Sequence, residues 1–451
     1  MEEKDFEELE KLLENKQLQE LHKKLLDMNP VDIAEFLGEI DNVYLLSVFR
    51  LLPKDISAEV FSYLDTEEAE HIVRSITDKE LCVLVDDMFI DDTVDFLEEV
   101  PANVVNRVLR AADPETRQTI NKYLRYDEDS AGSIMTNEMV QLHTHFTAKQ
   151  AIENIRKTAT DKETIYTCYC VDAQRKLVGT VELKDLLLCD EDTKVGEIMD
   201  EKNQIISVLT SDDQEDVADL ARKYDLLSVP VTDKEGRLVG IITIDDIVDI
   251  IEQENTEDFE KMAAMHPNDD TYIKTGVFKM AKNRILWLAI LMISATFTGQ
   301  LMSQKEALLS NWVFLTTAIP MLMDTSGNAG NQVSTLMIRG LALGEIKIKD
   351  YFKVLFKEFR VAIICALILV VLNFGRMFLM HNGDIKQYLV VSAALFIAIL
   401  IANAIGCSLP ILMKIIHLDP ALMAGPMMTT ILDVTTLAVY FFIAQKVLLR
   451  I

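Results

Sequence analysis

The hydrophobic pattern of the chain changes character twice along its length. Up to about residue 130, apolar residues recur at helical spacing in short segments separated by tight turns, and Pro30-Val-Asp-Ile is echoed by Pro53-Lys-Asp-Ile. Proline followed by an acidic residue suits a helix start. The N–H group that proline lacks would have no partner in the helix there, and the acidic side chain faces the positive end of the helix dipole. Stacked helix pairs of this kind form superhelical domains. Residues 1–130 are therefore predicted to form an all-α superhelical N-terminal domain.

Residues 131–255 instead carry β-branched runs typical of strands, and this pattern occurs twice. The segment from Val171 to Gly179 returns 61 residues later as the segment from Thr232 to Gly240. Each copy has a strand, a turn with aspartate, a second strand and then a helix. The arrangement resembles a tandem pair of CBS domains, which are α/β modules of βαββα order that pair with each other and often bind adenine nucleotides.

A short motif bears on nucleotide binding by this pair. The ribose-contacting Ser/Thr-x-x-Asp of CBS domains is present in the second copy as Thr243-Ile-Asp-Asp246, whereas the first copy has Glu182-Leu-Lys-Asp185. The resemblance therefore implies at most one good nucleotide site, with Thr243 and Asp246 as its candidate residues and ATP as a candidate regulatory ligand.

From Asp246 to about Lys282 the pattern is helical and rich in charge. It leads directly into the apolar half of the chain. We expect a connecting helix over residues 256–283 that can transmit motion, and the alternative is a plain solvated linker.

Five long apolar segments follow, and each is long enough for the ~20 residues that a helix needs to cross a bilayer. They predict an all-α membrane bundle of five helices over residues 284–451. The segments cover residues 285–302, 312–338, 354–380, 388–413 and 421–447.

Basic residues between these segments predict the orientation. Cytoplasmic loops carry an excess of Lys and Arg, and with a cytoplasmic N-terminus 11 basic residues, counted from Lys274, lie inside against 5 outside, counted up to Arg450. The N-terminus has no apolar segment typical of a cleaved signal peptide. We expect a multi-pass protein of the cell membrane whose C-terminus lies outside.

Charge divides the chain in the same place. Residues 1–270 hold 64 acidic and 28 basic residues, a net charge of −36, whereas residues 271–451 have a net charge of +8. So acidic a module would repel nucleic acid and anionic lipid. Its carboxylates form either a solvated surface or clusters that need divalent cations to pack together. The six cysteines show no CxxC pair or zinc spacing and are typical of small buried residues in a reducing compartment.

Two apolar segments contain a carboxylate. Asp324 precedes a Gly327-Asn-Ala-Gly330-Asn-Gln run, and Asp433 lies among threonines. Ionisable residues in a bilayer are expensive and usually face a bundle interior or a water-filled path. No Lys or Arg lies inside the apolar cores to pair with them, so they predict a cation pathway, and a buried ion pair or structural hydrogen bonds are the alternatives. Pro410 and Pro426 are expected to break their helices and free carbonyl groups for the path.

Taken together, the order of parts and these motifs resemble the MgtE-type magnesium transporter family over essentially the whole chain. The motifs are Pro320 with the Gly327–Gln332 run, Asn403 with Pro410, Asp419-Pro-Ala, and Gly425-Pro with Thr429-Thr430 and Asp433. The resemblance implies a homodimer whose second and fifth spans line a pore. It also implies that Asp433 lies at the ion site of the pore, that Asp419 lies at its cytoplasmic mouth, and that the soluble domains close the pore when Mg²⁺ bridges their acidic faces.

The resemblance further implies a set of Mg²⁺-sensing positions in the soluble part. They are Glu59, Asp91 and Asp95 in the helical domain, Asp213, Glu215, Asp225, Asp246 and Asp249 in the CBS pair, and Glu254, Glu257 and Asp258 along the connecting helix. No family role is implied for Asp324. Mg²⁺ is usually held through one or two carboxylates with its waters retained. No ATP-hydrolysing motif is present, so we expect downhill transport of Mg²⁺ by a protein that is not an enzyme, and the alternative is a CBS-regulated transporter of Co²⁺ or Mn²⁺.

Overall fold

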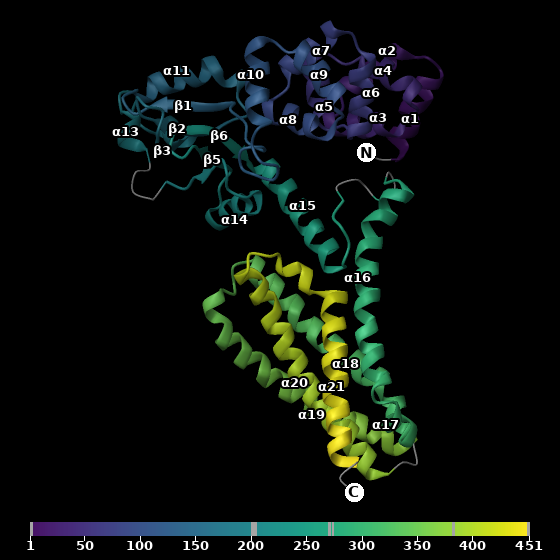
Figure 1. Cartoon of the computed structure of the whole chain (residues 1–451). Helices are drawn as coiled ribbons and strands as arrows, with labels where there is room; N and C mark the ends of the chain where they lie inside the picture. The colour runs from purple at the N-terminus through teal and green to yellow at the C-terminus, as the bar shows by residue number, and fades with distance from the viewer. Residues whose placement is uncertain (1–2, 200–204, 269–271, 273–274, 381–383, 449–451) are drawn as a thin grey trace. The chain divides into compact units, whose positions relative to one another are not determined.

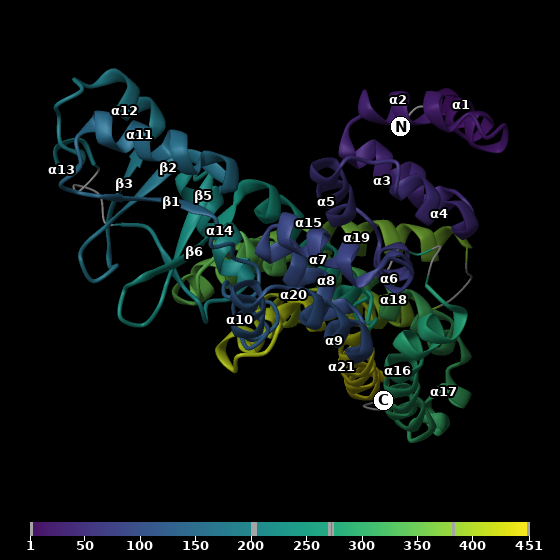
Figure 2. The same ribbon diagram turned by 90° about the horizontal axis from the view of Figure 1, so that it is seen from above.

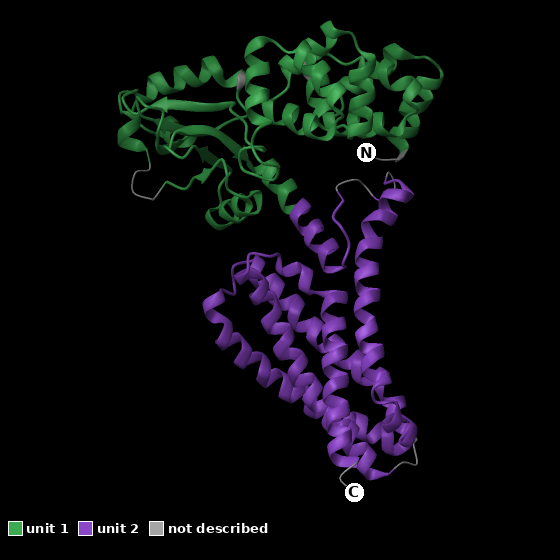
Figure 3. Cartoon of the chain, viewed as in Figure 1, with its two compact units in different colours: residues 1–251 green, residues 252–451 purple. Residues whose placement is uncertain are grey.

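The computed structural model describes residues 3–199, 205–268, 272, 275–380 and 384–448. It divides the chain into two units, residues 1–251 and residues 252–451, which are described separately below (Figure 3). Lys274 and Arg450, which were counted for the membrane orientation, lie outside the described residues.

The first unit begins with a run of short amphipathic helices (Figure 1). Proline occupies the first position of two of them, Pro30 in α3 and Pro114 in α10, as expected for helix starts. The helices are α1 (Glu3–Glu14), α2 (Leu18–Leu26), α3 (Pro30–Glu39), α4 (Asn42–Phe49), α5 (Lys54–Ser62), α6 (Thr66–Ser75), α7 (Asp78–Asp87), α8 (Ile90–Glu99), α9 (Ala102–Ala111) and α10 (Pro114–Tyr123).

These helices stack in an alternating order. Helix α3 packs on α5, α5 on α7 and α7 on α9, while α4 packs on α6, α6 on α8 and α8 on α10. Each helix from α3 to α8 thus contacts the second helix after it, which is the arrangement of stacked helix pairs. The predicted all-α helical N-terminal domain is confirmed.

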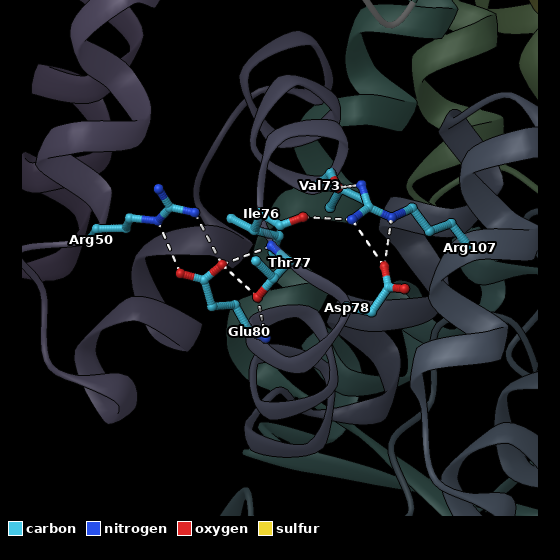
Figure 4. Close-up of polar contacts among 7 residues, drawn as sticks. All are labelled: Arg50, Val73, Ile76, Thr77, Asp78, Glu80 and Arg107. Atoms are coloured by element: carbon cyan, nitrogen blue, oxygen red, sulfur yellow. Dashed lines mark hydrogen bonds and ion pairs between the residues drawn. The ribbon is translucent and has the colours of Figure 1, made fainter.

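Polar side chains connect neighbouring helices of this stack, as Figure 4 shows. Glu80 closes a capping box with Thr77 at the start of α7 and accepts hydrogen bonds of 2.9 and 3.1 Å from Arg50, at the end of α4. The backbone hydrogen bond from Thr77 and the bond from Arg50 lower the pKa of Glu80 to about 2. Arg107 of α9 donates to the carbonyl groups of Val73 and Ile76 at the end of α6. Free helix-end carbonyls are satisfied in this way.

The next part of the first unit has the predicted βαββα order twice. In each copy the first two strands pair in parallel and the last two antiparallel, giving two sheets of order β1-β2-β3 and β4-β5-β6. The CBS pair is thereby confirmed as a fold. Its elements are β1 (Met139–His143), α11 (Ala148–Thr158), β2 (Thr164–Val171), β3 (Leu177–Glu182) and α12 (Leu183–Leu188), then α13 (Val195–Ile198), β4 (Val208–Leu209), α14 (Gln214–Tyr224), β5 (Ser228–Thr232), β6 (Leu238–Thr243) and α15 (Ile244–Met262).

The two sheets lie against each other, which the view of Figure 2 also shows. A small apolar cluster of Met139, Tyr169, Val171, Leu238 and Ile241 takes side chains from both sheets. The Tyr169 hydroxyl lies 2.6 Å from the Ser228 hydroxyl of the other copy. The larger core of this unit runs from the helical domain into the second CBS copy.

The predicted connecting helix over residues 256–283 is wrong as a single helix. Helix α15 continues from the second CBS copy to Met262, and the next helix, α16 (Val277–Ser303), begins 15 residues later. Ala264 has a left-handed backbone, with φ of 54°, which ends α15. His266 and Pro267 follow, and proline disfavours a helical conformation in the residue before it.

The second unit contains the end of α15 and the apolar helices. Among the described residues, four helices are long and apolar enough to cross a membrane: α16, α19 (Tyr351–Met380), α20 (Ile385–Ile415) and α21 (Gly425–Leu448). Helix α18 (Val313–Ala342), the expected second span, is as long, but the polar run from Asp324 to Gln332 lowers its hydropathy. It packs against α20 and α21. A short helix, α17 (Glu306–Asn311), precedes it.

The expectation that Pro410 and Pro426 break their helices is wrong. Pro410 lies inside the continuous helix α20 and is buried. Pro426 is the second residue of α21, where proline costs no helical hydrogen bond. The irregular backbone lies before α21, in the 3₁₀ turn η3 (Pro420–Met423) and at Gly425, whose φ is +53°.

Candidate cation sites

An acidic cluster lies in the first unit between α8 and α15. Asp91 and Asp95 are one turn apart on α8, and Asp246 lies near the start of α15. Burial and then the charge of Asp246 raise the pKa of Asp91 well above its usual range, and burial and then Glu99 and Asp246 raise that of Asp95 to about 6. Burial raises the pKa of Asp246 to about 6, although Thr243 donates a hydrogen bond to it. The structure thus brings three predicted sensor positions together.

Two carboxylates of this cluster were missed by the sequence reasoning. Burial, then Asp246, raises the pKa of Asp92 to about 7, and burial, then Asp92, raises that of Glu163 to about 8. One carboxylate oxygen of Glu163 is buried without a hydrogen-bond partner. Asp92 lies three residues before Asp95 on α8, so helix geometry could have suggested that it joins the cluster. Glu163 precedes β2, and no local pattern connects it with α8.

The balance of charge in this cluster is unusual. Within the described residues, no Lys or Arg forms an ion pair with Asp91, Asp92, Asp246 or Glu163. Buried charges are normally paired or coordinate metals. Here protons or external cations must balance the charge.

Glu59 lies near the same cluster, on the exposed side of α5. After burial, the charges of Glu59, Asp92, Asp245 and Asp249 raise the pKa of Tyr63, so these four carboxylates surround one phenol. The predicted sensor positions Glu59 and Asp249 therefore belong to the electrostatic environment of the cluster.

The other predicted sensor positions of the CBS pair lie at the two ends of α14. Asp213 caps its N-terminus and accepts a hydrogen bond of 2.9 Å from the Glu215 backbone. Asp225 ends the helix in a left-handed conformation, with φ of 54°. For Asp213 and Asp225 a local structural role is thus visible in addition to the predicted one.

A cavity of about 1180 Å³ lies in the CBS pair, next to α14. Neither Thr243 nor Asp246, the candidate nucleotide residues, lines it. Instead Thr243 donates a hydrogen bond of 2.7 Å to Asp246 beside the acidic cluster. The cavity is lined by the rings of Tyr166, Tyr169 and Tyr224 and by polar residues that include Glu182, Lys184, Asp225 and Ser228.

In the second unit, the end of α15 contacts the loop before α21. Asp419 caps η3 through a 2.8 Å hydrogen bond from the Ala421 backbone, and its other oxygen lies 2.8 Å from the Lys261 ammonium. Lys261 also pairs with Glu257 at 2.8 Å. Burial would lower the pKa of Lys261, but its bonds to Asp419 and Glu257 raise it instead. Burial, then Asp419, raises the pKa of Asp258. Three predicted positions thus share one cationic side chain.

Apolar contacts hold the same region together. Met262 packs against a cluster of Ile338, Ala421 and Ala424, which belong to α18 and the loop before α21. A Cβ atom at Gly425 would collide with the Met262 carbonyl oxygen. The absence of a side chain at Gly425 therefore lets the end of α15 approach the start of α21.

Asp433 lies in the middle of α21 and is partly buried. Within the described residues it has no hydrogen-bond or ion-pair partner, and the same holds for Asp324, which is exposed on α18. Ser326 and Thr436, whose hydroxyls lie 2.7 Å apart, join α18 to α21 close to Asp433.

Small residues allow α18, α20 and α21 to approach closely here. A Cβ atom at Gly330 would collide with Leu432, and one at Gly406 would collide with the Gly330 carbonyl. The side-chain oxygens of Asn331 and Asn403 are buried without a partner. The packed helices α18 and α20 thus hold buried side-chain oxygens that have no hydrogen-bond partner among the described residues.

No group of three or more His, Cys, Asp or Glu side chains in the described parts of the chain is arranged to hold a bare metal ion. Mg²⁺ in proteins is usually held through one or two carboxylates with several waters retained.

The chain is similar to known proteins along almost its whole length. Family models match the chain as a divalent cation transporter over residues 319–443, an MgtE intracellular N domain over residues 28–129 and a CBS domain over residues 195–253. The magnesium transporter MgtE of Thermus thermophilus is 35% identical over 452 residues, which cover 99% of both proteins. The chain belongs to the MgtE family of magnesium transporters. The magnesium transporter MgtE of Bacillus subtilis is 29% identical over 96% of this chain and 95% of that protein.

Solved structures of magnesium-transport proteins match about half of the chain. The crystal structure of the soluble part of a magnesium transporter superposes with a TM-score of 0.52 at 32% identity, over 56% of this chain and 98% of that one. The cytosolic domain of the Mg²⁺ channel MgtE in complex with ATP gives a TM-score of 0.51 at 36% identity, over 54% and 98%. As an MgtE protein, the chain is a membrane transporter for magnesium and not an enzyme.

Proposed function

We propose that the chain forms a homodimeric channel that lets Mg²⁺ enter the cytoplasm down its electrochemical gradient and that closes when cytoplasmic Mg²⁺ is high. In this proposal the N-terminus is cytoplasmic and the C-terminus is outside. The observation that carries the pore assignment is Asp433, a carboxylate without a partner in a helix that is apolar enough to cross a membrane.

The surroundings of Asp433 support passage of a hydrated cation. The unpartnered oxygens of Asn331 and Asn403 offer acceptors for water bound to an ion. One Asp433 from each subunit of a dimer would supply two carboxylates. Weak contact through water allows the ion to leave again, as conduction requires.

The acidic cluster of the first unit supports the sensing part of the proposal. Carboxylates with raised pKa values repel one another, so a divalent cation that binds between them favours the arrangement that brings them together. Mg²⁺ can shift an equilibrium only by its difference in affinity for the two states. Asp91, Asp92 and Asp246 provide that difference, because their charges act on one another, and can share one cation, only when α8 and α15 are adjacent.

We propose further that the CBS cavity binds ATP as a regulatory ligand. Its volume of about 1180 Å³ is slightly above the usual range for ligand pockets and leaves room for a nucleotide. The three tyrosine rings fit an adenine base, and Lys184 carries the charge that phosphates need. The relative that was crystallised with ATP supports this choice. Thr243 and Asp246 are then assigned to the acidic cluster and not to the nucleotide.

The test of the pore is Mg²⁺ flux into proteoliposomes containing the purified protein, reported by an enclosed dye. Asp433→Ala and Asp433→Asn should abolish flux while thermal unfolding and dimer size stay unchanged. Glu306→Gln removes an exposed carboxylate from α17 and serves as the matched control. Wild-type flux through a folded Asp433→Ala protein would refute the pore assignment.

The same assay addresses ion selectivity. A carboxylate also suits other divalent cations, so Co²⁺ and Mn²⁺ are compared with Mg²⁺ at equal concentration. Faster flux of Co²⁺ or Mn²⁺ would favour the alternative, a CBS-regulated transporter of those ions.

A further inference from the structure

Among the described residues of the second unit, the ammonium group of Lys261 forms ion pairs with two carboxylates. It lies 2.8 Å from a Glu257 oxygen and 2.8 Å from an Asp419 oxygen, and its side chain is 21% exposed. Glu257 is one turn earlier on the same helix, whereas Asp419 lies in the loop before α21. Lys261 therefore bridges two segments that are more than 150 residues apart in the sequence.

The carboxylates around Lys261 outnumber it. Glu257, Asp258 and Asp419 carry three negative charges, and the charge of Asp419 acts on Asp258 directly. With Lys261 the set has a net charge of −2, and without it the charge would be −3. A lysine ammonium is a compact charge on a flexible stem, so it can leave when a cation of higher charge arrives.

The neighbouring packing keeps Lys261 in place. The next residue, Met262, packs against Ile338, Ala421 and Ala424. Gly425 admits the Met262 carbonyl, as described above. The end of α15 is therefore held against the loop before α21 by apolar contacts and by the ion pair between Lys261 and Asp419.

We propose that Lys261 is a built-in cation that joins α15 to the loop before α21 when divalent cations are scarce and that Mg²⁺ must displace in order to bind Glu257, Asp258 and Asp419. Lys261 thereby sets the Mg²⁺ concentration at which this site fills. The inference rests on the proposed function, since it makes Lys261 the residue that tunes Mg²⁺ sensing beside the pore helix α21.

The proposal predicts two opposite effects of removing the charge. Without Lys261, a competing positive charge a few ångströms from the ion is lost, and Mg²⁺ should bind about tenfold more tightly at low ionic strength. In the absence of Mg²⁺, the bridge to Asp419 is lost and both segments should open more often. A side chain that only supported the fold would weaken the contact at every Mg²⁺ concentration.

The experiment is hydrogen–deuterium exchange of the intact protein in detergent, titrated with MgCl₂ at constant ionic strength. Peptides from residues 255–265 and 416–424 report the contact. Lys261→Gln should exchange faster than wild type without Mg²⁺, reach wild-type protection at saturating Mg²⁺, and have a midpoint about tenfold lower. Lys261→Arg should keep the wild-type midpoint within about twofold. Lys282→Gln removes a positive charge from α16 and controls for the general loss of charge.

Several outcomes would overturn the proposal. One is a Mg²⁺ midpoint for Lys261→Gln that equals or exceeds the wild-type midpoint. Another is incomplete protection of Lys261→Gln at saturating Mg²⁺, which would indicate a structural role for Lys261. The charge-exchanged variant Lys261→Glu with Asp419→Lys keeps the pair but reverses it, and should restore protection without Mg²⁺ relative to Lys261→Glu alone. Failure of that rescue would also count against the bridge. Hydrogen–deuterium exchange does not depend on transport. Absence of Mg²⁺ flux in the wild type would therefore refute the proposed function without deciding the role of Lys261.

Discussion

The acidic cluster of the first unit and the acidic set around Lys261 in the second unit balance their negative charge in different ways. Asp91, Asp92 and Asp246 have no basic partner among the described residues, and the pKa values of all three are raised. At the end of α15, by contrast, Lys261 pairs with Glu257 and Asp419. The first cluster must take protons or external cations. The second carries its own cation and remains connected when none is supplied.

The two sets of carboxylates should therefore respond differently to a divalent ion. The uncompensated cluster gains from any cation, so its packing should depend strongly on Mg²⁺. The compensated set exchanges one cation for another, so its response depends on competition.

Neutralising the uncompensated cluster should have the largest effect. The combined change Asp91→Asn, Asp92→Asn and Asp246→Asn should stabilise the first unit without Mg²⁺, because mutual repulsion disappears. The pKa of Asp92 alone, raised from 3.8 to about 7, sets an upper bound of about 4 kcal/mol at ~1.4 kcal/mol per pKa unit, and screening by water reduces the gain to about 1–2 kcal/mol. Limited proteolysis near residues 130–137 would measure it.

The wild type provides the contrast for that measurement. Its cleavage should slow as MgCl₂ rises, whereas cleavage of the triple variant should be slow throughout. KCl at equal ionic strength should not replace Mg²⁺. If KCl protects equally well, screening alone explains the effect and the cluster is no specific site.

Neutralising the second set should impair closing of the channel. Glu254→Gln, Glu257→Gln and Asp258→Asn together should raise the Mg²⁺ concentration that halves the open probability by tenfold or more, because the site loses its ligands and Lys261 loses one partner. Patch-clamp recording against cytoplasmic Mg²⁺ measures this. An unchanged midpoint would make this part of α15 a linker only. Deleting residues 1–130 should shift the midpoint in the same direction.

The first unit should also depend on pH when divalent cations are absent. The folded-state pKa values of Asp92, Asp95 and Asp246 lie at about 6–7, above the 3.8 of an isolated aspartate. The native state therefore binds more protons than the unfolded state between about pH 4 and pH 7, so its stability falls as pH rises through this window. The unfolding temperature of the intact protein in EDTA should increase by several degrees from pH 8 to pH 6.

The same Asn variants sharpen that test. Asp92→Asn with Asp246→Asn should flatten the pH dependence, and saturating Mg²⁺ should flatten it in the wild type. If the wild-type unfolding temperature decreased when the pH is lowered from 8 to 6, that result would contradict the raised pKa values.

A surface ion pair should have the smallest effect. Arg50 and Glu80 pair at 2.9 Å, but their side chains are 45% and 42% exposed. Exposed pairs contribute about 0–1 kcal/mol. Arg50→Met should therefore lower the free energy of unfolding by less than about 1 kcal/mol and leave the Mg²⁺ response unchanged. A loss above about 2 kcal/mol would show that this ion pair stabilises the fold more than an ordinary exposed pair does.

Local patterns in the sequence were enough for the order of parts. Proline at helix starts, the 61-residue repeat and the long apolar segments predicted the helical domain, the CBS pair and the positions of the membrane helices, because each depends on periodicity within one segment. They also drew attention to Asp324 and Asp433, whereas Asp419 came from the family resemblance. The family resemblance supplied the sensor positions, of which the structure gathers Asp91, Asp95 and Asp246 into one cluster.

Other features depend on packing between distant segments. Glu163 joins α8 only through the folded β2 region, and Lys261 meets Asp419 only because Met262 packs beside Gly425. Pro410 lies buried inside α20, which packs against α18, and periodicity does not encode that packing. The number of residues between two charges fixes their distance on one helix, but only the tertiary structure decides which charges from separate helices meet and whether a cation already lies between them.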